Sequence, residues 1–162
     1  MKTIYLAGGC FWGMQKFFDR FDGVGFTEVG YANGPDTSPS YKDVCAGSGH
    51  AETLRVDYDP AVISLTKLLE YYFTVVDPLS VNRQGEDSGV QYRTGIYYTC
   101  DDQLPEIREV WASEEKKAGA PLAVELSPLL NFFRAEEYHQ KYLDKNPGGY
   151  CHIPKSLFDL KD

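Results

Sequence analysis

Several kinds of site are missing from this 162-residue sequence. The sequence has no CxxC motif, and its four cysteines are widely spaced: Cys10, Cys45, Cys100 and Cys151. Such spacing is not that of a disulfide framework or a structural zinc site, so we expect reduced thiols and no bound metal. No apolar run approaches the roughly 18 residues of a membrane span. The short run at 4–7 is too brief for a signal peptide, so we expect a cytoplasmic protein.

Positive charge is also scarce. Sixteen Lys and Arg face 24 Asp and Glu, which gives a formal charge of −8. An acidic surface repels phosphate groups, so nucleic acids and anionic membranes are not expected as partners. The composition is that of a globular protein, and no linker, repeat or low-complexity segment divides it. We therefore predict one domain over residues 1–162, a monomer, with a flexible Gly-rich C-terminal segment at 146–162.

Hydrophobic periodicity predicts strands that alternate with helices. The expected strands are 3–7, 24–31, 52–58, 93–99 and one around 122–126. The expected helices begin near Trp12, after Ser64 and near Leu104, and a last one lies near 135–145. The first six elements follow the order β-α-β-β-α-β, which is typical of a split βαβ (ferredoxin-like) arrangement. We therefore predict the α+β class: a sandwich of a mixed sheet with helices, plus a C-terminal extension.

The stretch GGCFWG at residues 8–13 places a cysteine after two glycines and before two large aromatic residues. A strand ends here and a helix begins at about Phe11 or Trp12, so Cys10 would stand at a helix N-terminus. Free N–H groups and the helix dipole at that position lower the pKa of a thiol and make it nucleophilic. The alternative is a small, buried cysteine in a strand-to-helix turn.

Glu52, in GHAE, shares the parity of Leu54 and Val56 on the strand that follows. It would point toward the core, where burial raises the pKa of a carboxyl group and suits it to act as a general acid. A strand-end glutamate that turns outward is an equal alternative. Tyr92 shares a face with Ile96 and could donate a hydrogen bond into a cleft, although most such tyrosines only pack.

Cys151 lies in the Gly-rich stretch NPGGYC. A thiol on a mobile segment can swing toward another sulfur. Together with a nucleophilic cysteine, this is the layout of a redox enzyme that cycles through a sulfenic acid and a disulfide. The alternative is a surface cysteine without a role.

These motifs, in their order along the chain, resemble the A-type peptide-methionine sulfoxide reductases. The resemblance covers GGCFWG, YKDV at 41–44, GHAE at 49–52, NRQGEDSGVQYR at 82–93, EEYHQKYL at 136–143 and NPGGYC at 146–151. It implies an α+β core and reduction of methionine (S)-sulfoxide, free or in proteins. It also implies reduction of the enzyme by thioredoxin, without a metal or organic cofactor.

The resemblance also implies roles for individual residues. Cys10 would be the nucleophile, and Cys151 would resolve its sulfenic acid as a disulfide. Phe11 and Trp12 would form the wall that holds the substrate methyl group. Glu52 would protonate the sulfoxide oxygen, with hydrogen bonds from Tyr41 and Tyr92, and Asp87 would be a loop residue of the binding site. Cys45 is interpreted as packing, and Cys100 matches no functional position.

Two rival functions follow from the same residues. A cysteine hydrolase would pair Cys10 with His50 and would stay active without Cys151. A thiol redox sensor or peptide-binding module would form a disulfide with peroxide but show no preference for sulfoxides.

Overall fold

The computed structural model of this chain describes residues 1–159, so the last three residues of the predicted segment 146–162 lie outside it. Its principal strands are β1 (Lys2–Gly8), β2 (Val24–Ala32), β3 (Ala51–Tyr58) and β6 (Thr94–Tyr98). Its longer helices are α1 (Phe11–Phe18), α3 (Leu65–Val75) and α4 (Leu104–Ala118). The shorter elements are α2 (Tyr41–Cys45), β4 (Arg83–Gln84), β5 (Asp87–Ser88), β7 (Glu125–Pro128), β8 (Phe132–Arg134) and α5 (Tyr142–Lys145). Short 3₁₀ turns cover Val90–Tyr92, Asp101–Gln103, Glu137–His139 and Lys155–Asp159.

Six strands form one sheet in the order β7-β6-β1-β3-β2-β8. The central four, β6-β1-β3-β2, are antiparallel neighbours, and this is the order of a split βαβ fold. β7 runs parallel to β6, which makes the sheet mixed. The structure therefore confirms the predicted α+β class and sandwich.

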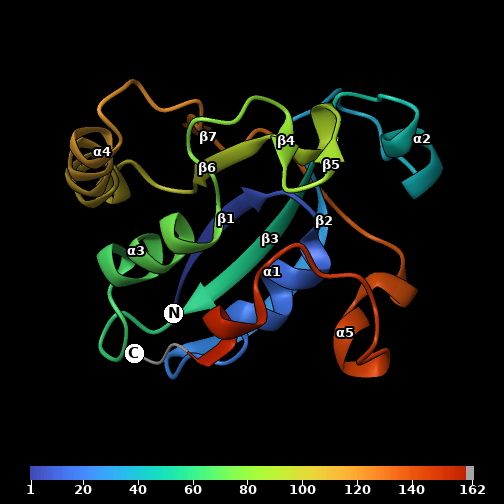
Figure 1. Ribbon diagram of the computed structural model, residues 1–162, viewed down its shortest axis with the longest axis horizontal. Helices are drawn as coiled ribbons and strands as arrows, with labels where there is room; N and C mark the ends of the chain where they lie inside the picture. The colour runs from blue at the N-terminus through green and yellow to red at the C-terminus, as the bar shows by residue number, and fades with distance from the viewer. Residues whose placement is uncertain (160–162) are drawn as a thin grey trace.

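Helices α1 and α3 lie against the same face of the sheet (Figure 1). The i, i+3, i+4 spacing of Met14, Phe17 and Phe18 puts all three in the core between α1 and the strands. Tyr72 of α3 links helix α3 to the strands β1 and β6. Its hydroxyl donates to the Ala7 carbonyl at 2.6 Å and accepts from the Gly95 N–H at 3.1 Å, where β1 and β6 meet. The end of β1, from which the GGCFWG turn leaves, is thereby fixed.

The helix predicted near 135–145 is wrong. The chain there forms the 3₁₀ turn Glu137–His139 and the one-turn helix α5, after β8 has paired with β2. Gln140 explains the interruption, because its amide exchanges hydrogen bonds with both the N–H and the carbonyl of Val29, at 3.0 and 2.9 Å. Lys141 then takes a left-handed conformation with φ of 55°, which ends any continuous helix.

None of the helices within residues 1–159 is long and apolar enough to cross a lipid bilayer.

Candidate active site

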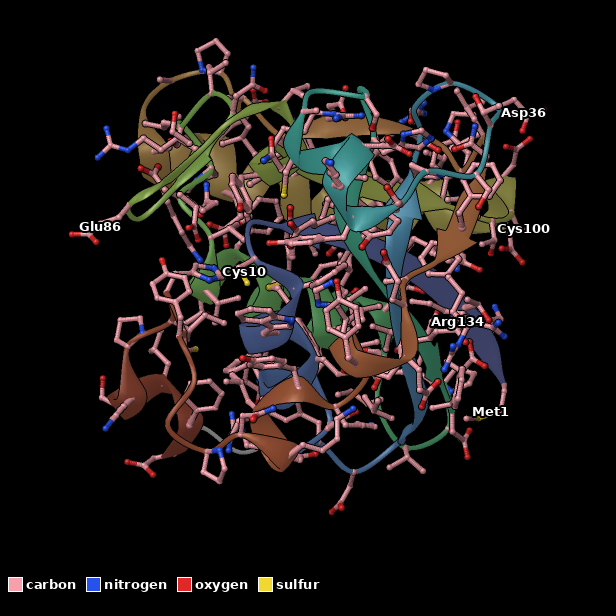
Figure 2. The ribbon with its side chains drawn as sticks, turned by 90° about the vertical axis from the view of Figure 1, so that its right-hand side faces the viewer. Met1, Cys10, Asp36, Glu86, Cys100 and Arg134 are labelled. Atoms are coloured by element: carbon pink, nitrogen blue, oxygen red, sulfur yellow. The ribbon has the colours of Figure 1, made fainter. Side chains whose placement is uncertain are left out.

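The turn between β1 and α1 places Cys10 at the start of a helix, as predicted. Gly9 has φ of +85°, and a β-carbon there would lie 2.7 Å from the Cβ of Gln84, so only glycine fits. Figure 2 shows Cys10 between the β4–β5 hairpin, whose tip carries Glu86, and the C-terminal segment. The nucleophile candidate thus stands where three distant parts of the chain meet.

The electrostatics of Cys10 differ from the sequence-based prediction. Its side chain is 7% exposed, and burial raises the pKa of the thiol, with the nearby Glu52 raising it further. The backbone N–H of Trp12 favours the thiolate, as expected at a helix N-terminus, but desolvation outweighs it. The prediction of a lowered pKa is therefore wrong, because burial keeps Cys10 a neutral thiol at neutral pH.

Glu52 points into the core from β3, as its parity predicts, and is 1% exposed. The Phe11 backbone N–H donates to Oε1 at 3.2 Å, and Oε2 is buried with no hydrogen-bond partner among residues 1–159. Burial raises the pKa of this carboxyl group to about 8, although the Phe11 N–H opposes the shift. At neutral pH Glu52 is therefore a neutral acid with a proton to donate.

Tyr41, Tyr92 and Asp87 come together around this carboxyl group. Burial raises the pKa of both phenols, and Glu52 contributes to the shift in each case. Tyr41 begins α2, whereas Tyr92 ends the 3₁₀ turn that follows β5. Asp87 in β5 influences the pKa of Cys10, Glu52 and Tyr92 and accepts a hydrogen bond from Tyr150 at 3.0 Å. Both tyrosines stay protonated at neutral pH and can donate hydrogen bonds.

Phe11 and Trp12 differ in their surroundings. Phe11 is 1% exposed and packs against the rings of Tyr31 and His139. Trp12 is half-buried, and its ring stacks on Tyr142 with centroids 3.8 Å apart. Its indole Nε1–H donates to Nδ1 of His139 at 2.9 Å. Both rings are therefore held in place by contacts with other aromatic side chains.

His139 and Tyr142 are functional candidates that the sequence reasoning did not assign. The motif EEYHQKYL contains both, but no periodicity links it to GGCFWG. Glu136 in the same motif accepts from the Tyr31 hydroxyl at 2.7 Å and from the Tyr41 backbone N–H at 2.8 Å. Residues of this motif thus contact and position the side chains of the candidate site.

Cys151 lies against the first turn of α1. Its Sγ is 2.8 Å from the position that a β-carbon on Gly13 would occupy, so the thiol fills space that a side chain would take. All four cysteines are free thiols. The interpretation of Cys45 as packing is wrong, because its side chain is exposed, beside Tyr41. Cys100 is exposed and lines a hollow of about 550 Å³ near Lys2, which contains none of the predicted site residues.

His50 is not available as a base for Cys10. Its ring is 2% exposed, and its Nδ1 and Nε2 are each 2.8 Å from an oxygen, in Ser48 and Pro35 respectively. Both nitrogens are occupied in holding the loop before β3, so the hydrolase hypothesis loses its catalytic base. Within residues 1–159, no cluster of three or more His, Cys, Asp or Glu side chains could hold a metal ion.

Comparison with known proteins decides the family. The family model described as peptide methionine sulfoxide reductase matches residues 2–161. The chain belongs to the peptide methionine sulfoxide reductase family. This reductase is 54% identical over 159 residues to peptide methionine sulfoxide reductase MsrA of Lachnoclostridium phytofermentans, covering 98% of this chain and 96% of the relative. It is 55% identical over 158 residues to MsrA of Clostridium acetobutylicum, covering 97% and 98%. The chain is an enzyme of this class.

Solved structures agree with the assignment. Mxr1 from Saccharomyces cerevisiae in reduced form matches the reductase with a TM-score of 0.89 and 41% identity, covering 99% of this chain and 92% of that one. Methionine sulfoxide reductase A of Corynebacterium diphtheriae matches with a TM-score of 0.85 and 35% identity, covering 95% and 83%. Mxr1 in complex with Trx2 matches with a TM-score of 0.62 and 29% identity, covering 87% and 84%.

Proposed function

We propose that this reductase converts methionine (S)-sulfoxide, free or in proteins, to methionine, with Cys10 as nucleophile and Glu52 as acid. The observation that carries the proposal is the buried Oε2 of Glu52, which has no partner among the described residues and lies beside a free thiol. A sulfoxide oxygen leaves sulfur only when it is protonated, and a carboxyl group with a pKa of about 8 holds that proton at neutral pH.

In the first step, the Glu52 carboxyl group gives its proton to the sulfoxide oxygen while the Cys10 sulfur attacks the sulfoxide sulfur. The thiol proton of Cys10 returns to the Glu52 carboxylate. The attack forms a sulfur–sulfur bond. The hydroxyl group then moves from the substrate sulfur to the Cys10 sulfur as the sulfur–sulfur bond breaks, so methionine leaves reduced by two electrons and Cys10 becomes a sulfenic acid. Hydrogen bonds from the neutral phenols of Tyr41 and Tyr92 stabilise the developing charge on oxygen.

The substrate methyl group needs an apolar surface beside the reacting sulfur. The residues Phe11 and Trp12 supply it because they directly follow the nucleophile in the chain. The Tyr142 stack and the His139 hydrogen bond fix the plane of Trp12, so the ring can reject the epimer whose oxygen points toward it. Asp87 would contact the polar part of the substrate from the β4–β5 hairpin.

In the second step, the Cys151 thiol attacks the Cys10 sulfenic acid and water leaves, which gives a disulfide. We assign its reduction to thioredoxin, with support from the solved complex of Mxr1 with Trx2. The electrons come from the Cys10 and Cys151 thiols and then from the external dithiol, so the proposed reaction requires no metal or organic cofactor. A monomer in the reducing cytoplasm is consistent with this chemistry.

The proposal is tested by adding methionine (S)-sulfoxide to the reduced protein without a reductant. We expect about one methionine per chain, because the cycle stops at the disulfide. Intact mass should show the loss of two hydrogens, and peptide mapping should recover a Cys10–Cys151 disulfide. Methionine release with the gain of one oxygen would reject Cys151 as the partner. The absence of methionine would reject the reductase mechanism and favour the redox sensor.

A further inference from the structure

Residues 150–153 lie against the turn that carries Cys10. Their side chains contact different residues of the site. Cys151 places its sulfur against Gly13, and Ile153, which is 2% exposed, packs against the same glycine. A β-carbon on Gly13 would be 3.4 Å from Cδ1 of Ile153. The segment that carries Cys151 is therefore held by a buried side chain on its C-terminal side.

The side chain of His152 lies beside three glycines, Gly8, Gly9 and Gly85. Its Nε2 lies 3.0 Å from the carbonyl oxygen of Gly8. A β-carbon on Gly9 would be 3.2 Å from that Nε2, and one on Gly85 would be 3.5 Å from Cβ of His152. A side chain at position 9 would therefore crowd the imidazole, whereas the contact of His152 with Gly85 is an ordinary van der Waals contact.

The hydrogen-bonding state of His152 follows from its partner. A carbonyl oxygen can only accept, so Nε2 carries the hydrogen and donates it to Gly8. Burial lowers the pKa of His152, although Asp87 and the Gly8 hydrogen bond oppose the shift, so the ring is neutral and Nδ1 is unprotonated. Nδ1 is buried and has no partner in the described part of the chain. Among the described residues, the imidazole of His152 therefore makes one hydrogen bond, to the carbonyl of Gly8.

On the other side of Cys151, the Tyr150 hydroxyl donates to Oδ2 of Asp87 at 3.0 Å. Tyr150 is 43% exposed, so water competes for this hydrogen bond, whereas the hydrogen bond of His152 is partly buried and competes with water less. Of the two contacts beside Cys151, the His152 hydrogen bond is therefore the stronger restraint.

We infer that His152 is a positioning residue for the resolving thiol, tethering Cys151 to the turn that carries Cys10. Gly8 stands two residues before Cys10, and His152 directly follows Cys151, so one hydrogen bond joins the backbones that bear the two sulfurs. The inference rests on the proposed function and refines its second step. Restricting the resolving thiol to the neighbourhood of its target raises its effective concentration.

The step that the tether assists is the formation of the disulfide. The Cys151 sulfur attacks the sulfur of the Cys10 sulfenic acid, a sulfur–sulfur bond forms and the sulfur–oxygen bond breaks. The hydroxyl group and the Cys151 proton leave as water. The Cys151 sulfur is oxidised and the Cys10 sulfur is reduced by the same amount, so no further reactant is needed. Release of methionine precedes this step and does not require the tether.

The experiment compares His152→Phe, which keeps a flat ring but removes the donor, with His152→Gln, whose amide can donate from the position of Nε2. Reduced proteins are mixed with methionine (S)-sulfoxide, and methionine, dimedone-trapped sulfenic acid and disulfide are followed in time. We expect His152→Phe to release its first methionine within about twofold of the wild-type rate. Loss of one hydrogen bond should slow disulfide formation by about 3- to 10-fold, and His152→Gln should restore most of that rate.

A second measurement reports the position of the segment without catalysis. In a Cys10→Ser background, alkylation of Cys151 by iodoacetamide should be faster with His152→Phe than with His152 intact. Tyr150→Phe should slow the disulfide step less than His152→Phe does.

The inference is overturned by a wild-type rate of disulfide formation in His152→Phe, or by an equal loss in His152→Gln. An equal slowing of methionine release also overturns it, because the residue would then serve the nucleophile turn. These outcomes leave the proposed function intact if wild-type protein releases methionine and forms the Cys10–Cys151 disulfide. If wild-type protein releases methionine but forms no such disulfide, the inference and the second step of the proposed function fail, whereas the first step stands. If it releases no methionine, the proposed function itself fails.

Discussion

The backbone N–H of Phe11 donates to Oε1 of Glu52 across 3.2 Å, joining the first residue of α1 to β3. This hydrogen bond fixes one carboxyl oxygen and leaves Oε2 buried without a partner in residues 1–159. A lone buried polar atom is costly to folding, and such atoms are typical of catalytic positions. The helix that presents Cys10 therefore also orients the acid beside it.

Replacing Glu52 with Gln removes the proton donor but preserves shape and the acceptor for the Phe11 N–H. We expect the rate of methionine release in a single turnover to fall by roughly 10²- to 10⁴-fold, with substrate binding little changed. Rapid-quench measurement of the first turnover tests this expectation. Glu106→Gln, on α4 and bonded to Thr66, is the matched control and should retain activity. A fully active Glu52→Gln enzyme would end the proton-donor assignment.

The pH dependence follows from the raised pKa of Glu52, about 8 in the folded protein against 4.5 when exposed. The acid is protonated below about pH 8 and is lost above it, so the first-turnover rate should fall about tenfold per pH unit there. Folding stability carries the same sign. The folded state binds this proton more tightly, so the contribution of Glu52 is fully present below about pH 4.5 and is lost as the pH rises through 8.

Urea unfolding of wild-type protein and Glu52→Gln at pH 5 and pH 8 measures the stability effect. Stability of the wild type relative to the variant should decrease over this interval. A constant difference would contradict the raised pKa.

Substitution of Trp12 by Leu should weaken substrate recognition more than it harms folding. The half-buried indole would lose its stack on Tyr142 and its hydrogen bond to His139. Loss of an apolar wall of this kind corresponds to roughly 10- to 200-fold in kcat/KM, mainly through KM. Phe11→Leu is the comparison, because Phe11 is 1% exposed and its loss should lower the thermal midpoint as well. Unchanged KM in Trp12→Leu would remove this residue from the binding site.

Substitution of Cys151 by Ser should separate the two halves of the cycle. One methionine per chain should still form at the wild-type rate, but a sulfenic acid should accumulate on Cys10 and thioredoxin-dependent turnover should fall sharply. Cys45→Ser and Cys100→Ser are matched controls, since both thiols are exposed and the proposed cycle uses neither. Normal thioredoxin turnover in Cys151→Ser, and its loss in Cys45→Ser, would transfer the resolving role to Cys45.

The sequence by itself determined the class of fold and the order of the main strands and helices along the chain. Alternation in β3 and the helical spacing of Met14, Phe17 and Phe18 are local patterns. In both elements the apolar side chains that share one face are buried in the core. The motif GGCFWG likewise placed a cysteine at a strand-to-helix turn, because the glycines and the change of period lie within six residues.

Tertiary structure alone decided the state of the site and its supports. The sign of the Cys10 pKa shift depends on how deeply the helix start is buried and on Glu52, which is 42 residues away in the chain, so a local argument from the helix N-terminus gave the wrong direction. The helix expected near 135–145 does not form for the same kind of reason, because the side-chain amide of Gln140 hydrogen-bonds to the backbone of β2. The contacts of His139 with Trp12 and of His152 with Gly8 join segments more than 120 residues apart. No periodicity records such pairs, because they form only when the sheet brings both ends of the chain to one turn.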